Sequence, residues 1–414
     1  MKKVISHSTL RKTILLCSIG GMLELFDFMI FIFFIDVFKT VFFPHASHFL
    51  ASLQTLSIFM VGYFARPFGG ILFGHFADRK GRKKPFSWTL FLMGLPALGM
   101  ALLPSYGEIG VYSPLLFLAL RILQGFSLGG EFPTAVTIMT ENTTEKERGF
   151  ATAVLSASAC IGVLLGSLSA LLMHQFFSMQ QLIGWAWRIP FLFGALIAFL
   201  GVYLRRSQVV LQLPTVKNNR LPIYIVIRDH FKKVLRAITV GSVISFSSFC
   251  FLFWPHFLNT YFHYSVKETL MLNAMGLVLL IVFTLFFGWM SFYVNRVTIY
   301  RFAGLLLVML SYPLLLLWKT HVLWELLFSY TMFAFLFGAM NAVYSGFIAE
   351  LFPSDICCSG TALSYNMTTA LVCGTLPLVV TYFCQFDHPI TVMLFGLITV
   401  GLLAASYTNQ NKFL

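Results

Sequence analysis

Five ionisable side chains interrupt long apolar stretches of this sequence: Glu24, Asp27, Arg66, Arg121 and Glu131. An ionisable group in hydrocarbon costs about 2.5–3.5 kcal/mol on insertion scales, so we expect each one to be paired or functional. Three carboxylates face two guanidiniums, which leaves one acid without a fixed partner. In a low-dielectric cavity such an acid favours its neutral form and can load and release a proton. The pattern therefore predicts a proton-binding carboxyl group inside the membrane.

The spacing of these residues predicts which of them share a helix face. Glu24 and Asp27 are three residues apart and lie on one face of a helix. At roughly 100° per residue, Arg121, Gln124 and Glu131 fall within an arc of about 80°. A structural alternative stays open, in which Arg121 braces a helix interface through Glu131 or a backbone carbonyl.

Arg66 has a structural alternative of its own. It precedes Pro67, and a long cationic side chain near the end of a span can snorkel towards the membrane surface. The sequence alone does not separate this role from a functional one.

Composition assigns these residues to a membrane protein. Of the 414 residues, 58% are hydrophobic and only 10% are charged, far from the roughly 25% charged residues of a soluble domain, and the mean hydropathy is +0.84. A hydrocarbon core needs about 20 apolar residues per helix, so there is room for about a dozen spans. We predict twelve, at 13–38, 50–76, 86–104, 112–139, 150–174, 187–204, 236–258, 267–291, 301–318, 322–349, 359–384 and 389–407.

The basic residues orient these spans. Of the 28 Lys and Arg residues, 22 fall in segments on the side of the termini, four on the other side, and two within spans. Because Lys and Arg accumulate in cytoplasmic loops, both termini are expected in the cytoplasm. This topology explains the net charge of +13 without any nucleic acid partner.

The longest polar segment, Arg205 to Lys233, separates six spans from six. We expect an N-terminal bundle at 1–204, a cytoplasmic linker at 205–235 and a C-terminal bundle at 236–414. A weak internal repeat sets Gly74 against Gly288 and Arg148 against Ser359. The fold class predicted is an all-α membrane protein with twelve transmembrane helices in two pseudo-symmetric six-helix bundles.

Catalytic and cofactor signatures are missing from the sequence. The seven Cys lack C-x-x-C spacing, and the ten His form no ligand pair with a carboxylate. No phosphate-binding glycine loop and no nucleophile elbow is present. We therefore expect no enzyme activity, cofactor or metal, and transport energy that comes from a gradient. We also expect the protein to be a monomer in the lipid bilayer.

The densest charge lies in the segment from Gly74 to Lys84, GHFADRKGRKK. Its pattern G-x-x-x-D-R-x-G-R-K resembles the loop signature of the major facilitator superfamily. The resemblance implies that Asp78 binds the N-terminus of a helix that begins near Ser359, with Arg148 as its ion-pair partner. These contacts would close an inner gate, to which Arg79, Arg82 and the glycines Gly74 and Gly81 would also belong. The alternative is that the positive charge of this segment only sets the orientation of the protein in the membrane.

A narrower resemblance covers residues 10 to 400. The blocks Gly20 to Phe28, Ala65 to Gly70, Arg121 to Gly125 with Gly129 to Glu131, and Glu350 to Pro353 with Ser359 to Asn366 resemble the metabolite:proton symporters, which include proline/betaine and α-ketoglutarate permeases. The chain departs from that family where Leu25 replaces an aromatic residue. It also departs in the serine-rich stretch from Ser242 to Ser248.

Together these features predict a proton-coupled symporter of a small organic acid, amino acid or betaine in the cell inner membrane, working by alternating access. Arg121 would bind a substrate carboxylate bidentately, and Asp27, Glu24 and Glu131 are the candidate proton sites. The other predicted lining residues are Phe26, Gln124, Asn341, Tyr365 and Asn366. The alternatives are a proton-driven exporter of a drug-like compound or siderophore on the same fold, and a non-transporting receptor or enzyme.

Overall fold

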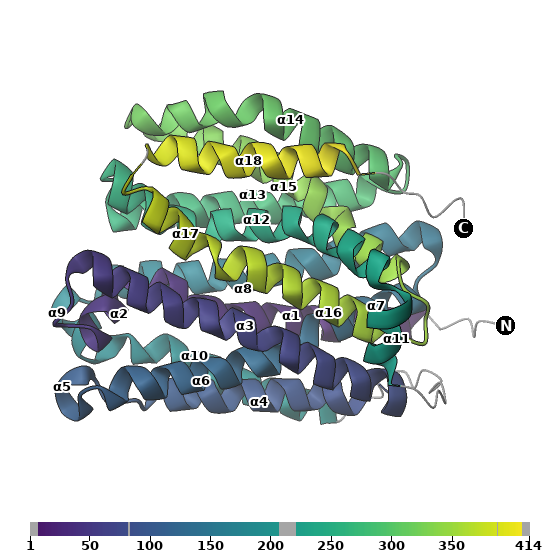
Figure 1. The fold of residues 1–414 in the computed structure, drawn as a ribbon, viewed down its shortest axis with the longest axis horizontal. Coiled ribbons are helices and arrows are strands. Elements are labelled where there is room, and N and C mark those ends of the chain that lie inside the picture. Colours follow the sequence, from purple (N-terminus) through teal and green to yellow (C-terminus); the bar gives the residue numbers. More distant parts are fainter. Residues whose placement is uncertain (1–6, 82, 207–220, 387, 408–414) are drawn as a thin grey trace.

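The computed structural model describes residues 7–81, 83–206, 221–386 and 388–407, and these residues form helices joined by short loops (Figure 1). In the first half of the chain the elements are α1 (His7–Phe33), α2 (Ile35–Phe42), α3 (His48–Lys80), α4 (Lys83–Ala101), α5 (Tyr106–Ile109), α6 (Tyr112–Leu128), α7 (Glu131–Asn142), α8 (Glu145–Phe176), α9 (Met179–Gln181), a π-helix (Leu182–Ala186) and α10 (Arg188–Arg206). In the second half they are α11 (Pro222–Asp229), α12 (Phe231–Phe262), α13 (Val266–Met290), α14 (Arg296–Leu316), a 3-10 turn (Leu317–Lys319), α15 (Leu323–Glu350), α16 (Cys357–Thr369), a π-helix (Ala370–Gly374), α17 (Leu376–Phe383) and α18 (Pro389–Ala405).

The helices agree with the predicted all-α membrane fold. Among the described residues, nine helices are long and apolar enough to cross a membrane, and a tenth span is a pair of helices, Met179–Ala186 and Arg188–Tyr203, bent by 44°. Two shorter apolar helices, Trp88–Ala101 and Pro389–Ala405, occupy the remaining predicted spans. Each of the twelve predicted spans therefore coincides with a helix or a broken helix.

Three predicted spans are broken rather than continuous. The span at 13–38 breaks at Phe34, the span at 359–384 passes through the π-helix at Ala370–Gly374, and the span at 112–139 breaks at Gly129 and Gly130. At the last break the backbones of α3 and the segment at Gly129 approach so closely that a Cβ at Gly129 would collide with the carbonyl oxygen of Arg66. This break leaves Glu131 at the start of α7.

Local sequence signals fix where the helices begin. Thr144 and Glu147 form a capping box at the start of α8, and Ser265 and Glu268 form one at the start of α13. In each box the hydroxyl oxygen accepts a hydrogen bond from a backbone N–H that has no partner within the helix. The loops between long spans are therefore encoded by short polar motifs.

We call residues 7–206 the N-terminal half and residues 221–407 the C-terminal half. In Figure 1 helices α1 to α10 occupy the lower part of the view, and α12 to α15 and α18 the upper part. Two helix pairs make the most extensive contacts between the halves, α8 with α13 and α3 with α16. The linker boundaries at 205–235 stay a prediction; the described part of that segment contains α11.

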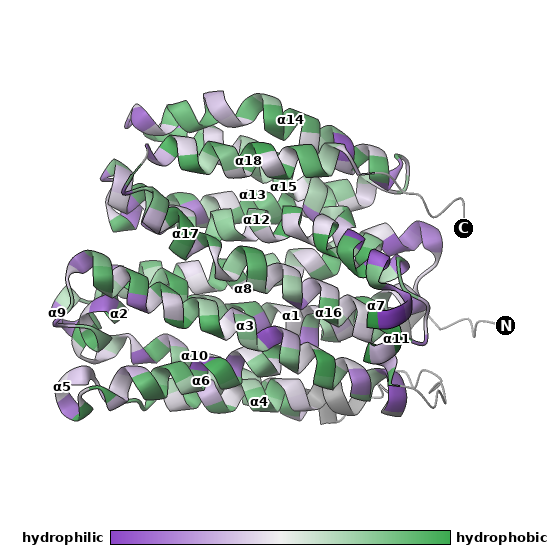
Figure 2. Ribbon diagram, in the orientation of Figure 1, coloured by the Kyte–Doolittle hydropathy of each residue, from purple (hydrophilic) through white to green (hydrophobic). Residues whose placement is uncertain are grey.

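The described ends of the chain lie at one end of the bundle, which we call the terminal end; the other is the opposite end (Figure 1). Hydrophobic residues dominate the helices along their length, and hydrophilic residues gather at both ends (Figure 2). This distribution is that of a multi-pass membrane protein.

Candidate transport site

Asp27 sits in a buried network between α1 and α6. The amide nitrogen of Gln124 donates to Asp27 Oδ2 at 2.5 Å, and the amide oxygen of Gln124 accepts from Arg121 Nη1 at 2.6 Å. Both Nη atoms of Arg121 also donate to the carbonyl oxygen of Phe28, at 3.2 and 3.3 Å. Gln124 thus links the carboxylate to the guanidinium without direct contact between the two charges.

The second oxygen of Asp27 has no hydrogen-bond partner in the described part of the chain. There, no cation lies within the 4.0 Å ion-pair distance of this carboxylate, and a Cβ added to Gly194 of α10 would lie 2.8 Å from Oδ1. Arg121 instead rests on two aromatic rings, 4.3 Å from the centroid of Phe28 and 4.5 Å from that of Phe31. Asp27 therefore fits the acid without a fixed countercharge that the sequence predicts.

Arg66 connects three helices from the two halves of the chain. Its Nη2 donates to Glu24 Oε1 of α1 at 3.1 Å, and its Nε donates to Asn366 Oδ1 of α16 at 3.3 Å. Asn366 donates in turn to the carbonyl oxygens of Gly129 at 2.6 Å and Ala362 at 2.8 Å. Arg66 is fully buried, so the snorkelling alternative for this residue is wrong.

Glu131 lies apart from the other two acids. From the start of α7 its Oε2 accepts a hydrogen bond from Thr89 Oγ1 of α4 at 2.5 Å. Arg121 and Gln124 instead bond to α1, at the Phe28 carbonyl and the Asp27 carboxylate. The structure thus places the three predicted acids in three separate surroundings.

A cavity of about 50 Å³ lies between the two halves. It is lined from the N-terminal half by Leu25, Phe132, Ser156, Ala159, Cys160 and Val163, and from the C-terminal half by Ile244, Ser245, Ser247, Ser248, Phe251, Leu277, Leu280, Asn341, Tyr344, Tyr365 and Thr369. No charged side chain is among these lining residues of the described chain. The wall is aromatic and hydroxyl-rich.

Two predicted lining residues, Asn341 and Tyr365, border this cavity. Tyr365 stacks on Phe132 with ring centroids 4.8 Å apart, and Asn341 donates to Cys160 Sγ at 3.4 Å and Thr284 Oγ1 at 3.3 Å.

The remaining predicted lining residues do not border the cavity in this conformation. Arg121 and Gln124 lie inside the N-terminal half, and Asn366 lies in the bridge with Arg66. Phe26 packs edge-to-face on Phe193 of α10, with centroids 5.9 Å apart.

Several lining residues were missed by the sequence analysis, notably Ser156, Tyr344 and Thr369. For three others a signal existed, because Ser245, Ser247 and Ser248 belong to the serine-rich stretch in which the chain departs from the family pattern. No sequence feature distinguishes the other cavity-lining hydroxyl residues from hydroxyl residues elsewhere in the spans. Their cavity-facing orientation follows from helix packing alone.

At the terminal end, Asp78 binds the start of α16. Its Oδ1 accepts from the backbone N–H of Cys358 at 3.3 Å, and its Oδ2 accepts from that of Ser359 at 2.8 Å. The first N–H groups of a helix have no partner within it, and the helix dipole favours an anion there. The expected contact between α3 and the start of α16 is therefore present.

The other predicted gating residues surround this contact. A Cβ added to Gly74 would lie 3.1 Å from the Cα of Ser359, so α3 and α16 approach closely. Gly81 ends α3 with φ of 86°, a conformation that favours glycine. Arg79 is exposed at the end of α3, and Arg82 lies outside the described residues.

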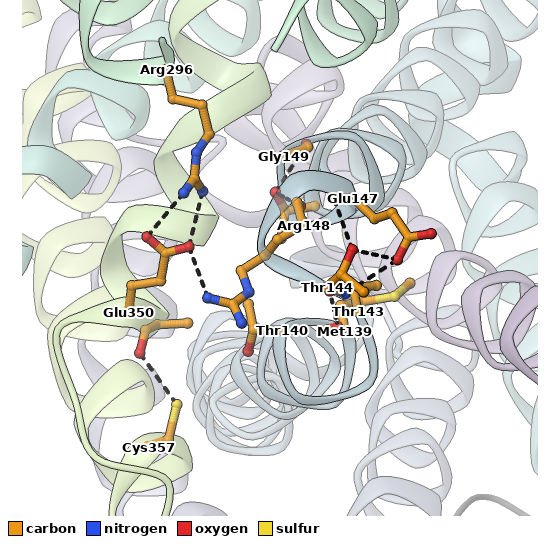
Figure 3. A network of polar contacts seen from close by, with 12 residues as sticks. Met139, Thr140, Thr143, Thr144, Glu147, Arg148, Gly149, Arg296, Glu350 and Cys357 are labelled. Atoms are coloured by element: carbon orange, nitrogen blue, oxygen red, sulfur yellow. Dashed lines mark hydrogen bonds and ion pairs between the residues drawn. The ribbon is translucent and has the colours of Figure 1, made fainter. Parts of the chain in front are cut away.

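The predicted ion pair between Arg148 and Asp78 is wrong. Arg148 Nη1 lies 3.1 Å from Glu350 Oε1. Arg296 donates to the same carboxylate, from Nη1 to Oε1 at 2.9 Å and from Nη2 to Oε2 at 3.3 Å (Figure 3). Glu350 ends α15 within reach of both guanidiniums, whereas Asp78 accepts backbone N–H groups. This carboxylate therefore bridges α8, α14 and α15 across the seam between the halves.

The sequence matches a family model and several known proteins. A family model described as Major Facilitator Superfamily matches residues 17–377. The alpha-ketoglutarate permease of Escherichia coli is 30% identical over 90% of this chain and 88% of that protein. The citrate-proton symporter of Klebsiella pneumoniae is 28% identical, covering 95% and 90%. The glycine betaine/proline/ectoine/pipecolic acid transporter OusA of Dickeya dadantii is 25% identical, covering 98% and 85%.

Solved structures agree on the fold. A structure of the proton:xylose symporter XylE superimposes with a TM-score of 0.75 at 16% identity, covering 97% of this chain and 95% of that one. XylE from E. coli in a partially occluded inward open conformation gives 0.72 at 17% identity, covering 96% of each chain. At this identity the similarity shows the fold alone. With the family match and the relatives, it follows that the chain belongs to the major facilitator superfamily, within its metabolite:proton symporters, and is a membrane transporter for small organic substrates rather than an enzyme.

Proposed function

We propose that this chain is a proton-coupled symporter that carries a small zwitterionic metabolite across the cell inner membrane by alternating access, with both termini in the cytoplasm. The observation that carries the proposal is the surroundings of Asp27. This carboxylate is buried mid-span, hydrogen-bonded at one oxygen only, and separated from Arg121 by Gln124. The relatives named citrate-proton symporter and OusA support transport of small organic substrates by this kind of chain.

The proton step would take place at Asp27 Oδ1. Burial disfavours the charged carboxylate, and the nearest guanidinium is occupied by the Phe28 carbonyl and by Gln124. Binding a proton there neutralises a buried carboxylate that has no ion-pair partner among the described residues. A neutral Asp27 would lower the free-energy cost of rearranging the two halves around a buried carboxyl group. This difference between the charged and neutral forms is the physical basis of coupling.

The cavity wall favours a zwitterion over a polyanion. A substrate with two or three carboxylates would enter a site whose lining, among the described residues, has no cation. A quaternary or secondary ammonium group would meet the rings of Phe132, Phe251, Tyr344 and Tyr365, which attract cations through their faces. The single carboxylate of such a substrate has one buried cation near the wall: Arg66, whose Cζ lies 5.5 Å from the Tyr365 ring.

Alternating access would require the cross-half contacts at the terminal end to break. These contacts are the Asp78 bond to α16 and the Glu350 bridge to Arg148, and the Arg66 bond to Asn366 lies on their mid-membrane side. We assign the inner gate to this set, with Gly74, Gly81, Arg79 and Arg82 in supporting roles.

Uptake into liposomes tests the proposal. Purified carrier with an inward proton gradient should accumulate glycine betaine or proline in preference to citrate or 2-oxoglutarate, and dissipating the gradient should abolish accumulation. Asp27→Asn should abolish gradient-driven accumulation yet keep substrate exchange, because a neutral side chain stands in for the protonated state. Glu108→Gln, at an exposed carboxylate of α5, is the matched control.

Two results would contradict these assignments. Unchanged accumulation in Asp27→Asn would remove Asp27 from the mechanism. Preferential accumulation of citrate by the unmodified carrier would overturn the zwitterion assignment and leave the symport assignment standing.

A further inference from the structure

A second acid–base pair spans the seam at the opposite end of the bundle. Asp36 lies on α2, and its Oδ2 is 3.7 Å from Nδ1 of His256 on α12. The two residues line a small cavity of about 20 Å³, whose other walls come from Ile32 and Phe33 on one side and from α12 and α13 on the other. None of these residues contacts Asp27 or the central cavity.

The two side chains lie within ion-pair distance of each other. At 3.7 Å the contact is longer than hydrogen-bonding distance, and Nδ1 of His256 is buried without a hydrogen-bond partner in the described chain. The imidazole side chain is 5% exposed and the carboxylate 38% exposed. A proton on His256 would therefore gain a carboxylate partner across the seam.

Other charged or titratable groups lie near the pair on α2, α3, α8 and α13. Lys39 of α2 contacts Asp36 Oδ1 at 2.5 Å. His48 of α3 and His174 of α8 lie within electrostatic range of Asp36, and Lys267 of α13 lies within range of His174. Lys39 stands one turn from Asp36 on the same helix, so its contact does not depend on how the halves are arranged. Only His256 and Lys267 come from the other half.

We propose that Asp36 and His256 form a second proton-binding site, a latch that holds the opposite end closed when His256 carries a proton. His is the side chain whose charge changes between about pH 5 and 8. The charged imidazole attracts the carboxylate only when α2 and α12 are together, so the proton binds more tightly to the closed state than to the open one. By linkage, the closed state is favoured at low pH and loses this stabilisation as the pH rises. The latch rests on the proposed alternating access, but it needs neither Asp27 nor a known substrate.

A distance measurement in the absence of substrate tests the latch. Phe176 at the end of α8 and Phe386 after α17 are each 72% exposed at the opposite end, and each can be replaced by p-acetylphenylalanine carrying a spin label. Pulsed electron resonance on the carrier in lipid nanodiscs then gives the ratio of closed to open molecules. We expect this ratio to fall about fivefold or more between pH 5.5 and pH 8.

Variants identify the group that titrates. His256→Gln and Asp36→Asn should each remove the pH dependence. His256→Lys, which keeps a permanent charge, should hold the closed population high at both pH values. His45→Gln is the matched control, because His45 is exposed in the loop between α2 and α3 at the same end. This variant should keep the pH dependence of the closed-to-open ratio.

Three results would overturn the latch. The unmodified carrier could show no pH dependence of the closed-to-open ratio, or the pH dependence could survive in His256→Gln. It could also disappear in His48→Gln or His174→Gln instead. The labelled carrier meets no substrate and no gradient in this experiment. A failure of the latch is therefore separate from a failure of proton symport, which the uptake assay measures.

Discussion

Arg66 and Arg121 are the same residue type in the same kind of apolar helix, and the structure places them in contrasting surroundings. Both are fully buried and both lie over aromatic rings. Arg66 pairs with a carboxylate and bonds to α16 of the other half. Arg121 has neutral partners, and all of them belong to the N-terminal half.

The contrast separates a contact that must change during transport from one that can stay fixed. Opening the seam between α3 and α16 breaks the bond between Arg66 and Asn366, whereas the bonds from Arg121 to Phe28 and Gln124 join α6 to α1 within one half. We infer that Arg66 belongs to the moving interface and that Arg121 holds the shape of the N-terminal half. This inference makes mutations at the two sites distinguishable.

The largest effect is expected at Arg66. Arg66→Gln leaves the buried carboxylate of Glu24 without its charge partner, and breaking a buried ion pair from one side costs about 3–5 kcal/mol. We expect a large fall in the thermal unfolding temperature, followed by tryptophan fluorescence, together with loss of uptake.

A double variant controls for stability alone. Glu24→Gln with Arg66→Gln replaces the ion pair by two amides, so it should recover most of the unfolding temperature while uptake stays absent. If the double variant also recovered uptake, Arg66 would have no role beyond stability and the contrast with Arg121 would disappear.

Arg121→Lys should act mainly on stability. A lysine ammonium cannot donate from two forked nitrogens to the Phe28 carbonyl and to Gln124 together, so hydrogen bonds worth about 1–3 kcal/mol are lost. We expect a lower unfolding temperature and a KM for uptake within about twofold of the unmodified carrier. A KM raised tenfold with unchanged stability would show that Arg121 binds substrate, as the sequence predicts.

The fold could be predicted from the sequence because its signals are local. Apolar runs of membrane length identify all twelve spans. The contact of Asp78 with α16 was implied by the family resemblance of the basic segment from Gly74 to Lys84. The breaks inside three spans were missed, because the backbone approach at Gly129 depends on the path of α3.

The site was predicted less completely, for a physical reason. Spacing along one helix places residues on a face, but it does not say which neighbouring helix that face meets. For this reason the residue types of Asp27, Gln124 and Arg121 suggested a network, while the orientation of Arg121 away from the cavity could not be foreseen. The partner of Arg148 was missed likewise, because Glu350 is 202 residues away in sequence.

The smallest effect is expected from Asn366→Ala. This change removes the cross-half bond to Arg66 and the bonds to the Gly129 and Ala362 carbonyls, but it leaves the ion pair of Arg66 with Glu24 in place. The bond to Arg66 has a charged donor and contributes about 1.5–3 kcal/mol, so the terminal end should open about tenfold more often or beyond, with little change in unfolding temperature. Spin labels at the terminal end measure this ratio. Thr331→Ala, which removes a hydroxyl that bonds only within α15, is the control and should leave the ratio unchanged. An equal response in both variants would mean that the bridge through Arg66 does not hold the two halves together, and Arg66 would then resemble Arg121.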